Sequence, residues 1–117
     1  KSFETTSKVS RKKFLEALRV SGIFASKIND VRINFKPPQT LTFRTANAAV
    51  GENEAVLLGE VKGDEAEIAF NYKFLIDGVE NLSQEYVFFG VNQDSAPALL
   101  RSEDDPSYMY VLRPIRL

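Results

Sequence analysis

Residues 31–44 read VRINFKPPQTLTFR, and this stretch decides the class of fold. Apolar and polar side chains alternate on both sides of the Pro37-Pro38 pair, which is the pattern of strands that bury one face. Val31 to Phe35 and Leu41 to Phe43 are therefore predicted as two strands joined by a short turn. A sheet of neighbouring strands with short connections is typically antiparallel.

The period of two returns in several other segments of the chain. Turn-forming residues separate these segments, as expected for a meander of strands. Residues near the start, from Phe3 to Val9, have a weaker extended character. The further predicted strands are Ala55 to Lys62, Ala66 to Phe70, Tyr86 to Val91, Ala98 to Arg101 and Tyr108 to Leu112.

Two segments change to the helical period. From Arg11 to Ser21 an apolar side opposes a mostly basic side, and Ser10 is placed to be the N-cap. From Tyr72 to Leu82 a second apolar stripe follows Asn71, another N-cap residue. Gly78 weakens the second helix by up to about 1 kcal/mol relative to alanine. Two amphipathic helices are predicted.

The predicted order is strand, helix, four strands, helix, three strands. This order predicts an α+β fold with two helices packed on one face of a largely antiparallel sheet. The length of 117 residues fits one domain, residues 1–117, with one core. No low-complexity linker or internal boundary interrupts it.

Composition argues against an enzyme. The chain contains no cysteine and no histidine, which excludes disulfides, thiolate metal sites, the commonest nucleophile and the commonest general base. The acidic run Glu103-Asp104-Asp105 lacks the ligand spacing of a calcium loop and is predicted to be an exposed turn. We therefore expect no catalytic residue, no metal and no cofactor.

Charge and hydropathy point to an ordinary globular domain. Fifteen basic residues oppose 16 acidic ones, so bulk charge does not indicate a nucleic-acid binder. No segment has the roughly 20 apolar residues of a membrane helix. The chain begins with Lys1 and shows no leader, so we expect a cytoplasmic protein and interpret this sequence as a piece of a longer chain.

Four segments together resemble one known family. They are FLEALRVS at residues 14–21, VRI at 31–33, IAFN at 68–71 and YVLRPIRL at 110–117. Their order and spacing are similar to domain three of the bacterial DNA polymerase sliding clamp, the polymerase III beta subunit. The ending is the most specific part, because the family stops on a Val-hydrophobic-Met-Pro-Met/Val/Ile-Arg-Leu tail. The resemblance covers essentially the whole chain.

The resemblance implies a DNA-clamp fold and a non-catalytic role. Family members have three similar domains per chain and form a head-to-tail dimer, a ring that encircles duplex DNA and holds the polymerase. We therefore expect a processivity factor whose partners are double-stranded DNA, the polymerase III alpha subunit, the clamp loader and repair proteins. The alternative is a stand-alone adaptor domain of the same fold without a DNA role; an enzyme is a more distant one.

The resemblance also implies a hydrophobic pocket for partner peptides beside the C-terminal tail. Independently of the family, Phe74 lies about 100° or more from the centre of its helix's apolar stripe, so it should face away from the core. It stands where the family usually has a tyrosine, and Arg113 stands where a methionine is common. Without the family, the tail reads as the apolar end of a last strand. The matching positions are Phe74, Ser95, Pro97, Val111, Arg113, Pro114, Ile115, Arg116 and Leu117.

Two further surfaces follow from the resemblance. Gly22, Ile23 and Phe24 match the subunit interface, although core packing also explains the last two. The fragment lacks its partner surface, so it should be monomeric. The basic helix residues should face DNA through weak, sequence-independent phosphate contacts, although solvated helix charges are the plainer interpretation. The predicted DNA-facing residues are Arg11, Lys12, Lys13, Arg19 and Lys73.

Overall fold

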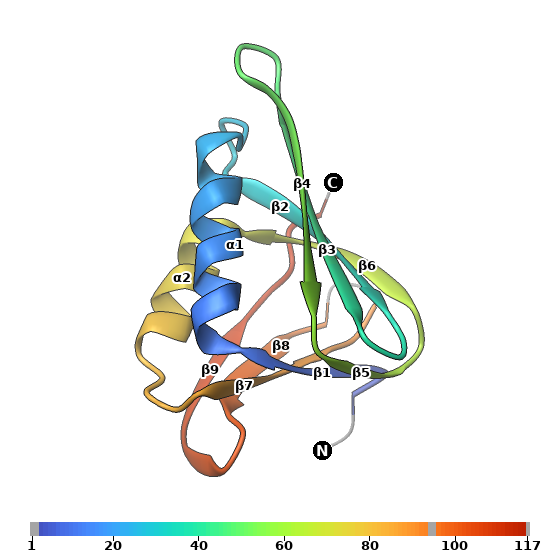
Figure 1. Cartoon of the computed structure of the whole chain (residues 1–117), viewed down its shortest axis with the longest axis vertical. Coiled ribbons are helices and arrows are strands. Elements are labelled where there is room, and N and C mark those ends of the chain that lie inside the picture. The colour runs from blue at the N-terminus through green and yellow to red at the C-terminus, as the bar shows by residue number, and fades with distance from the viewer. Residues whose placement is uncertain (1–2, 94–95, 117) are drawn as a thin grey trace.

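The computed structural model of the protein describes residues 3–93 and 96–116 (Figure 1). Within these described residues the fold has two helices and nine strands, and every strand ladder is antiparallel. In chain order they are β1 (Thr5–Ser10), α1 (Arg11–Ile23), β2 (Asp30–Lys36), β3 (Thr40–Asn47), β4 (Gly51–Leu58), β5 (Glu60–Gly63), β6 (Ala66–Asn71), α2 (Tyr72–Glu80), β7 (Tyr86–Val91), β8 (Ala98–Ser102) and β9 (Asp105–Leu112).

The strands form two sheets built on the same plan. The five-stranded sheet has the order β5-β1-β7-β8-β9, and the four-stranded sheet has the order β4-β3-β2-β6. Each half of the chain runs strand, helix and three strands, from β1 to β4 and from β6 to β9. The first strand of each half pairs with the second strand of the other half, β1 with β7 and β6 with β2. The two halves are therefore interlocked.

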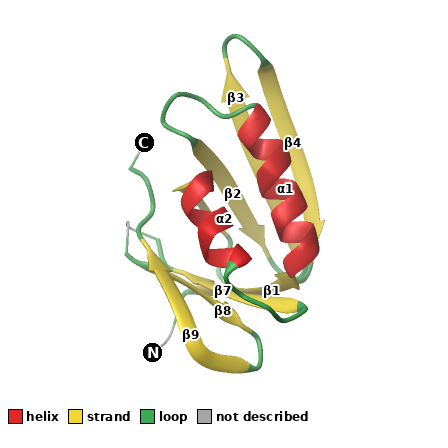
Figure 2. Ribbon diagram, turned by 90° about the vertical axis from the view of Figure 1, so that its left-hand side faces the viewer, coloured by secondary structure: helices red, strands yellow, loops and turns green. Residues whose placement is uncertain are grey.

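Both helices lie on the same side of the sheets. Figure 2 shows α1 and α2 side by side over the four-stranded sheet, with the five-stranded sheet running below them. Helix α1 contacts β1, β3 and β4, and α2 contacts β6 and β8. The predicted α+β fold with two helices on one side is confirmed, and the strands divide into two sheets.

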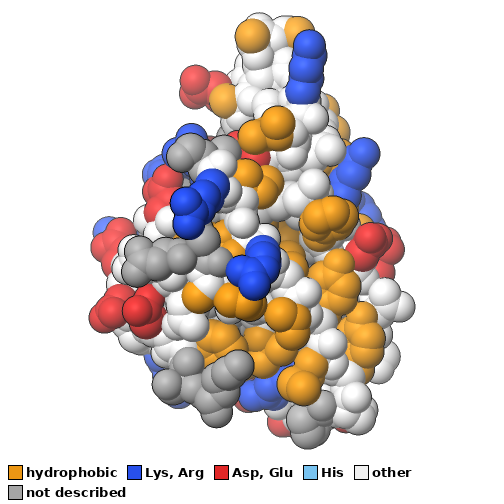
Figure 3. Space-filling model, turned by 180° about the vertical axis from the view of Figure 1, so that it is seen from behind, with side chains coloured by type: hydrophobic (Ala, Val, Ile, Leu, Met, Phe, Trp, Pro, Cys, Tyr) orange, Lys and Arg blue, Asp and Glu red, His pale blue; other side chains and the backbone are white. Residues whose placement is uncertain are grey.

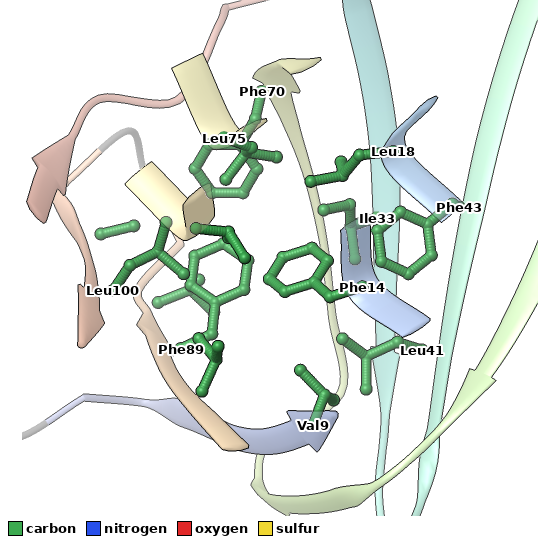
Figure 4. Close-up of a cluster of buried hydrophobic side chains, with 14 of the residues drawn as sticks. Val9, Phe14, Leu18, Ile33, Leu41, Phe43, Phe70, Leu75, Phe89 and Leu100 are labelled. Atoms are coloured by element: carbon green, nitrogen blue, oxygen red, sulfur yellow. The ribbon is translucent and has the colours of Figure 1, made fainter. Parts of the chain in front are cut away.

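One aromatic side chain joins the two sheets and a helix in a single core. The ring centroid of Phe89 on β7 lies 5.8 Å from that of Phe14 on α1, 5.5 Å from Phe35 on β2 and 5.4 Å from Phe70 on β6. All four side chains are fully buried. Figure 4 shows Phe14 and Phe89 in the middle of the cluster, between side chains from both sheets.

Both predicted N-caps are confirmed, and the predicted element ends are close. The Ser10 hydroxyl accepts a hydrogen bond from the Lys13 N–H at 3.2 Å. The Asn71 carbonyl Oδ1 accepts from the N–H groups of Lys73 at 2.9 Å and Phe74 at 3.2 Å. Each cap satisfies donors that the first helical turn leaves without intrahelical partners. Helix α1 runs two residues past its predicted end, α2 stops two residues short of its own, and β9 begins at Asp105.

The predicted single strand from Ala55 to Lys62 is wrong. The chain breaks at Gly59, so that β4 belongs to the four-stranded sheet and β5 to the five-stranded one. The Gly59 N–H donates to the Gln39 carbonyl at 2.9 Å. Leu57 and Val61 are both buried, so the apolar alternation continues through the break and hides it. Periodicity cannot distinguish one long strand from two that share a parity.

A substitution at Gly59 tests how the chain passes from β4 in one sheet to β5 in the other. A Cβ atom at this position would lie 2.5 Å from the Lys8 carbonyl oxygen and 2.7 Å from Val9 Cγ1. Because the β1 backbone is held between β5 and β7, Gly59→Ala should lower the free energy of unfolding by about 1–3 kcal/mol. Chemical denaturation measures the change. As a control, Glu60→Ala changes the neighbouring exposed residue and should leave the free energy of unfolding within about 0.5 kcal/mol of wild type. An equally small effect of Gly59→Ala would contradict the close packing of Gly59 against β1.

Candidate functional site

The C-terminal tail crosses from one sheet to the other. Strand β9 ends at the buried Leu112, and Arg113 is exposed. The chain then reaches β6, where the Ile115 N–H donates to the Ala69 carbonyl at 2.8 Å. Because β6 is the last strand of its sheet, this contact covers part of an open edge. The tail therefore does more than end a strand. It lies against the strand that leads directly into α2.

Phe74 faces away from the core, as its position on the helix predicts. Its side chain is 53% exposed, whereas the adjacent Leu75 is fully buried. It lies in the first turn of α2, three residues after the strand that the tail contacts at Ala69. An exposed aromatic side chain of this kind can be buried in an interface with another protein.

A depression on the outer face of the five-stranded sheet brings two of the predicted residues together. Pro97 and Val111 line it, and its volume is about 420 Å³. Phe74 is not among its described lining residues. The other lining residues are Phe3, Phe88, Ala98, Leu99, Arg101 and Met109.

The close packing of β9 on α2 was not anticipated from the sequence. A Cβ atom at Gly78 would lie 2.4 Å from the Tyr110 ring, so the missing side chain makes room for this strand. Burial raises the pKa of the Tyr110 phenol, and the nearby Asp77 carboxylate and Tyr108 raise it further. From the sequence alone, Gly78 predicts only a weaker helix. Its unusual position inside a predicted helix was the available signal of a close contact.

The basic helix residues divide into two groups. Arg11 donates hydrogen bonds to the carbonyls of Val79 and Glu80 and so caps the end of α2. Arg19 forms a salt bridge with the Glu80 carboxylate at 2.9 Å, which offsets its charge. Lys12, Lys13 and Lys73 are exposed, and no salt bridge between described residues involves them. These three lysines are the stronger candidates for contacts with phosphate.

The residues predicted for the subunit interface have different surroundings. Ile23 is 66% exposed at the end of α1, so core packing does not account for it. Phe24 is half-buried. A Cβ atom at Gly22 would lie 2.5 Å from the Tyr72 ring, so this glycine lets the two helices approach each other.

Local hydrogen bonds order the acidic turn. The Asp105 carboxylate accepts a hydrogen bond from the Ser107 N–H at 3.0 Å, and the side-chain and backbone hydrogen bonds of Ser107 lower the pKa of Asp105. Within residues 3–93 and 96–116, no group of three or more acidic, histidine or cysteine side chains is placed to hold a metal ion. In the same residues no helix is long and apolar enough to span a membrane.

Comparison with known proteins identifies the family. Residues 1–116 match the family model of the DNA polymerase III beta subunit, C-terminal domain. The chain belongs to this family. Among curated relatives, the beta sliding clamp of Vibrio cholerae is 30% identical over 117 residues and that of Synechococcus elongatus is 26% identical over 119 residues. Each alignment covers all of this chain.

The structure of this chain closely matches solved structures of clamp C-terminal domains. The structure superimposes on the polymerase III beta subunit of Thermotoga maritima with a TM-score of 0.94 and 24% identity. The sliding clamp of Pseudomonas aeruginosa bound to griselimycin gives 0.93 and 24%. All of this chain and 32% of each of those chains are aligned. The chain spans about a third of the length of the curated clamps it matches.

Within this clamp domain, the predicted pocket residues are only partly brought together. The first group, Pro97 and Val111, shares the depression on the five-stranded sheet. Ile115 pairs with Ala69 on β6, and the element that follows β6, helix α2, carries Phe74. Pro114 is half-buried, whereas Arg113 and Arg116 are exposed. The predicted pocket residues Ser95 and Leu117 lie outside the described residues.

The Gly78 contact gives a test of how the tail is positioned. Alanine at this position favours the helix by up to about 1 kcal/mol, but the Tyr110 ring occupies the space of the methyl group. The clash should dominate, so Gly78→Ala should lower the free energy of unfolding by about 1–2 kcal/mol in chemical denaturation.

The double variant Gly78→Ala with Tyr110→Val is the matched control. Removing the ring should recover part of the loss, giving a favourable coupling energy between the two sites. Strictly additive effects would show that the ring is not what limits this position.

Proposed function

We propose that residues 1–117 are the third domain of a bacterial sliding clamp, a ring-shaped dimer that encircles duplex DNA and tethers the replicative polymerase. The observation that carries the proposal is the family match, which extends from residue 1 to residue 116. Such a role needs no catalytic group, because a closed ring keeps the polymerase at high effective concentration near DNA. In this proposal the protein acts in the cytoplasm, and the preceding two domains complete each subunit.

The tail region is proposed to dock partners through short peptides. The partners are the polymerase III alpha subunit, the clamp loader and repair proteins. Phe74 and Val111 are 53% and 63% exposed, and the tail that links the two sheets provides Ile115, which pairs with Ala69 on β6. Aromatic side chains that become buried are common anchors of such interfaces, and apolar neighbours exclude water around them. Phe74 keeps the aromatic wall that the family builds with tyrosine but cannot donate a phenolic hydrogen bond.

The proposed ring contact includes the end of α1 and the edge strand β4. Ile23 is exposed there, and β4 is an edge strand with exposed Val56 and Leu58. An edge strand can pair with a strand of another subunit, which suits a head-to-tail ring. Gly22 supports this surface indirectly, by fixing α1 against α2.

DNA is proposed to pass along the helical side of the domain. Lys12, Lys13 and Lys73 lie on the two helices and can contact phosphates without reading sequence. Arg11 and Arg19 keep a smaller part in this proposal, because both are engaged at the end of α2. Weak contact is what a sliding ring requires.

The peptide site is tested on the full-length protein, because part of the family pocket belongs to the preceding domain. The probe is a peptide with the clamp-binding segment of the organism's polymerase III alpha subunit, titrated by calorimetry. Phe74→Ala and deletion of residues 115–117 should each weaken binding by roughly tenfold or more, since each removes buried apolar contact. Val20→Ala removes apolar surface from α1, where Val20 is 41% exposed, and should have no effect.

Unchanged affinity in both pocket variants would contradict the proposed peptide site. If the wild-type protein does not close around circular duplex DNA in a clamp-loading assay but still binds the peptide, the adaptor alternative replaces the ring.

The DNA-facing surface is tested through salt dependence. Replacing Lys12, Lys13 and Lys73 by alanine in the full-length protein should weaken binding to a short duplex. It should also reduce the slope of log K against log salt by about 0.9 for each lost phosphate contact. Fluorescence anisotropy at several salt concentrations measures both. The matched control replaces Lys8, Lys36 and Lys62, which lie on strands; equal losses in the two triple variants would contradict the assigned face.

A further inference from the structure

Helix α2 ends on a residue that its own electrostatics disfavour. The carbonyl groups at the end of a helix carry partial negative charge, so cationic side chains are favoured there and carboxylates are not. The last residue of α2 is Glu80, and the last turn of this helix contains no basic residue. Asp77, in the same turn, adds a second negative charge. Residues that break such a local rule often have a functional role.

Arginines from the other helix compensate for this negative helix end. The Arg11 guanidinium donates hydrogen bonds of 3.2 and 3.1 Å to the carbonyls of Val79 and Glu80, so the backbone is capped without the Glu80 side chain. Arg19 donates separately to the Glu80 carboxylate, at 2.9 Å. The side chains of this pair are 56% and 48% exposed, and exposed ion pairs contribute little to stability. The fold therefore does not depend on a carboxylate at position 80.

The pair formed by Arg19 and Glu80 belongs to the side of the domain that is proposed to meet DNA. Figure 2 shows the two helices side by side, and this pair joins them. Lys12 and Lys13 are exposed on α1, and Lys73 is exposed on α2. From behind, the described Lys and Arg side chains are dispersed, and the main gathering is of hydrophobic side chains (Figure 3). Neutralising an arginine on the helical side therefore changes the charge that DNA meets.

We propose that Glu80 competes with DNA phosphates for Arg19 and so limits how tightly this domain holds the duplex. The inference rests on the proposed DNA contact and extends it by assigning a residue that regulates its strength. A guanidinium presents the same fork of N–H donors to a carboxylate and to a phosphate. The carboxylate that accepts from Arg19 at 2.9 Å therefore occupies a donor that a phosphate would use.

Such competition suits a protein that has to move along DNA. Each phosphate contact must be broken when a ring advances, and each contact releases condensed counterions, which stabilises the bound state. A free arginine on the helical side would add one such contact, because its planar group binds phosphate through two donors, whereas lysine acts as a point charge. Glu80 removes this contact and leaves the three lysines on the helices to provide a weak attraction that does not depend on sequence.

The experiment compares two charge-matched variants of the full-length protein. Glu80→Gln removes the carboxylate that pairs with Arg19. Glu16→Gln removes an exposed carboxylate three residues before Arg19 on α1, and no salt bridge between described residues involves Glu16. Binding to a short duplex is measured by fluorescence anisotropy at several salt concentrations.

Only the variant that frees Arg19 should bind DNA clearly more tightly. Glu80→Gln should raise the affinity about three- to tenfold at about 50 mM salt and steepen the slope of log K against log salt by about 0.9, as expected for one added phosphate contact. Glu16→Gln should raise the affinity by about twofold or less and leave the slope unchanged, because it adds no contact.

Further measurements assign the gain to Arg19. Adding Arg19→Ala to Glu80→Gln should remove the gain in affinity and in salt slope, because no freed guanidinium remains. The free energy of unfolding should be nearly the same in Glu80→Gln and Glu16→Gln, since the exposed pair contributes little to stability. Sliding gives an independent measurement: rings loaded on long duplex DNA should diffuse more slowly with Glu80→Gln than with wild type, whereas Glu16→Gln should not slow them.

The outcomes separate the role of Glu80 from the DNA contact on which it rests. Equal gains in the two single variants, or a gain in Glu80→Gln that survives Arg19→Ala, would show that only overall charge matters and would overturn the competition. No gain in Glu80→Gln, while replacing the three lysines still weakens binding, would overturn it and leave the DNA-facing side in place. If replacing the lysines also has no effect, the DNA-facing side itself is wrong, and the role of Glu80 fails with it.

Discussion

The contact of Phe89 with Phe14, Phe35 and Phe70 is the interaction on which the rest of the structure depends. One ring touches the first helix, the second strand and the sixth strand, so both sheets and α1 share a single core. Truncating a fully buried phenylalanine typically costs about 3–5 kcal/mol, a large part of the stability of a domain of this size. The surfaces proposed for function all lie outside this cluster, on strand edges, helix faces and the tail. Side chains on these surfaces can therefore vary without disturbing the aromatic cluster.

Glycines determine where these surfaces sit. Gly22 lets α2 approach α1, Gly78 lets β9 approach α2, and Gly90 admits the Phe3 ring. Each position brings an element that carries proposed binding residues closer than any side chain would allow. Because glycine has no Cβ atom, these three positions allow close packing that any other residue would prevent. This packing helps to fix the positions of Phe74, the C-terminal tail and the depression beside Val111.

Most of the fold could be predicted from the sequence because it follows from local patterns. The caps at Ser10 and Asn71 and the alternation in β2 and β3 depend on neighbouring residues only. The division between β4 and β5 could not be predicted, because Leu57 and Val61 keep the same parity across Gly59. The exposure of Phe74 followed from helical geometry, whereas the contact of Ile115 with Ala69 depends on residues 46 positions apart. The depression next to Val111 likewise requires four segments to come together, around residues 3, 88, 97–101 and 109–111, which no local pattern records.

The exchange of strands between the two halves has a consequence for how the chain folds. Strand β1 pairs with β7, so residues 5–10 find their main partners only at residues 86–91. Fixing such distant segments requires closing a long loop before any favourable contact is made, which slows folding. During synthesis, β1 can meet β5 earlier, but its pairing with β7 must wait until residue 91 has left the ribosome. The interlocked halves thus make folding of this domain a late, all-or-none event in the life of the nascent chain.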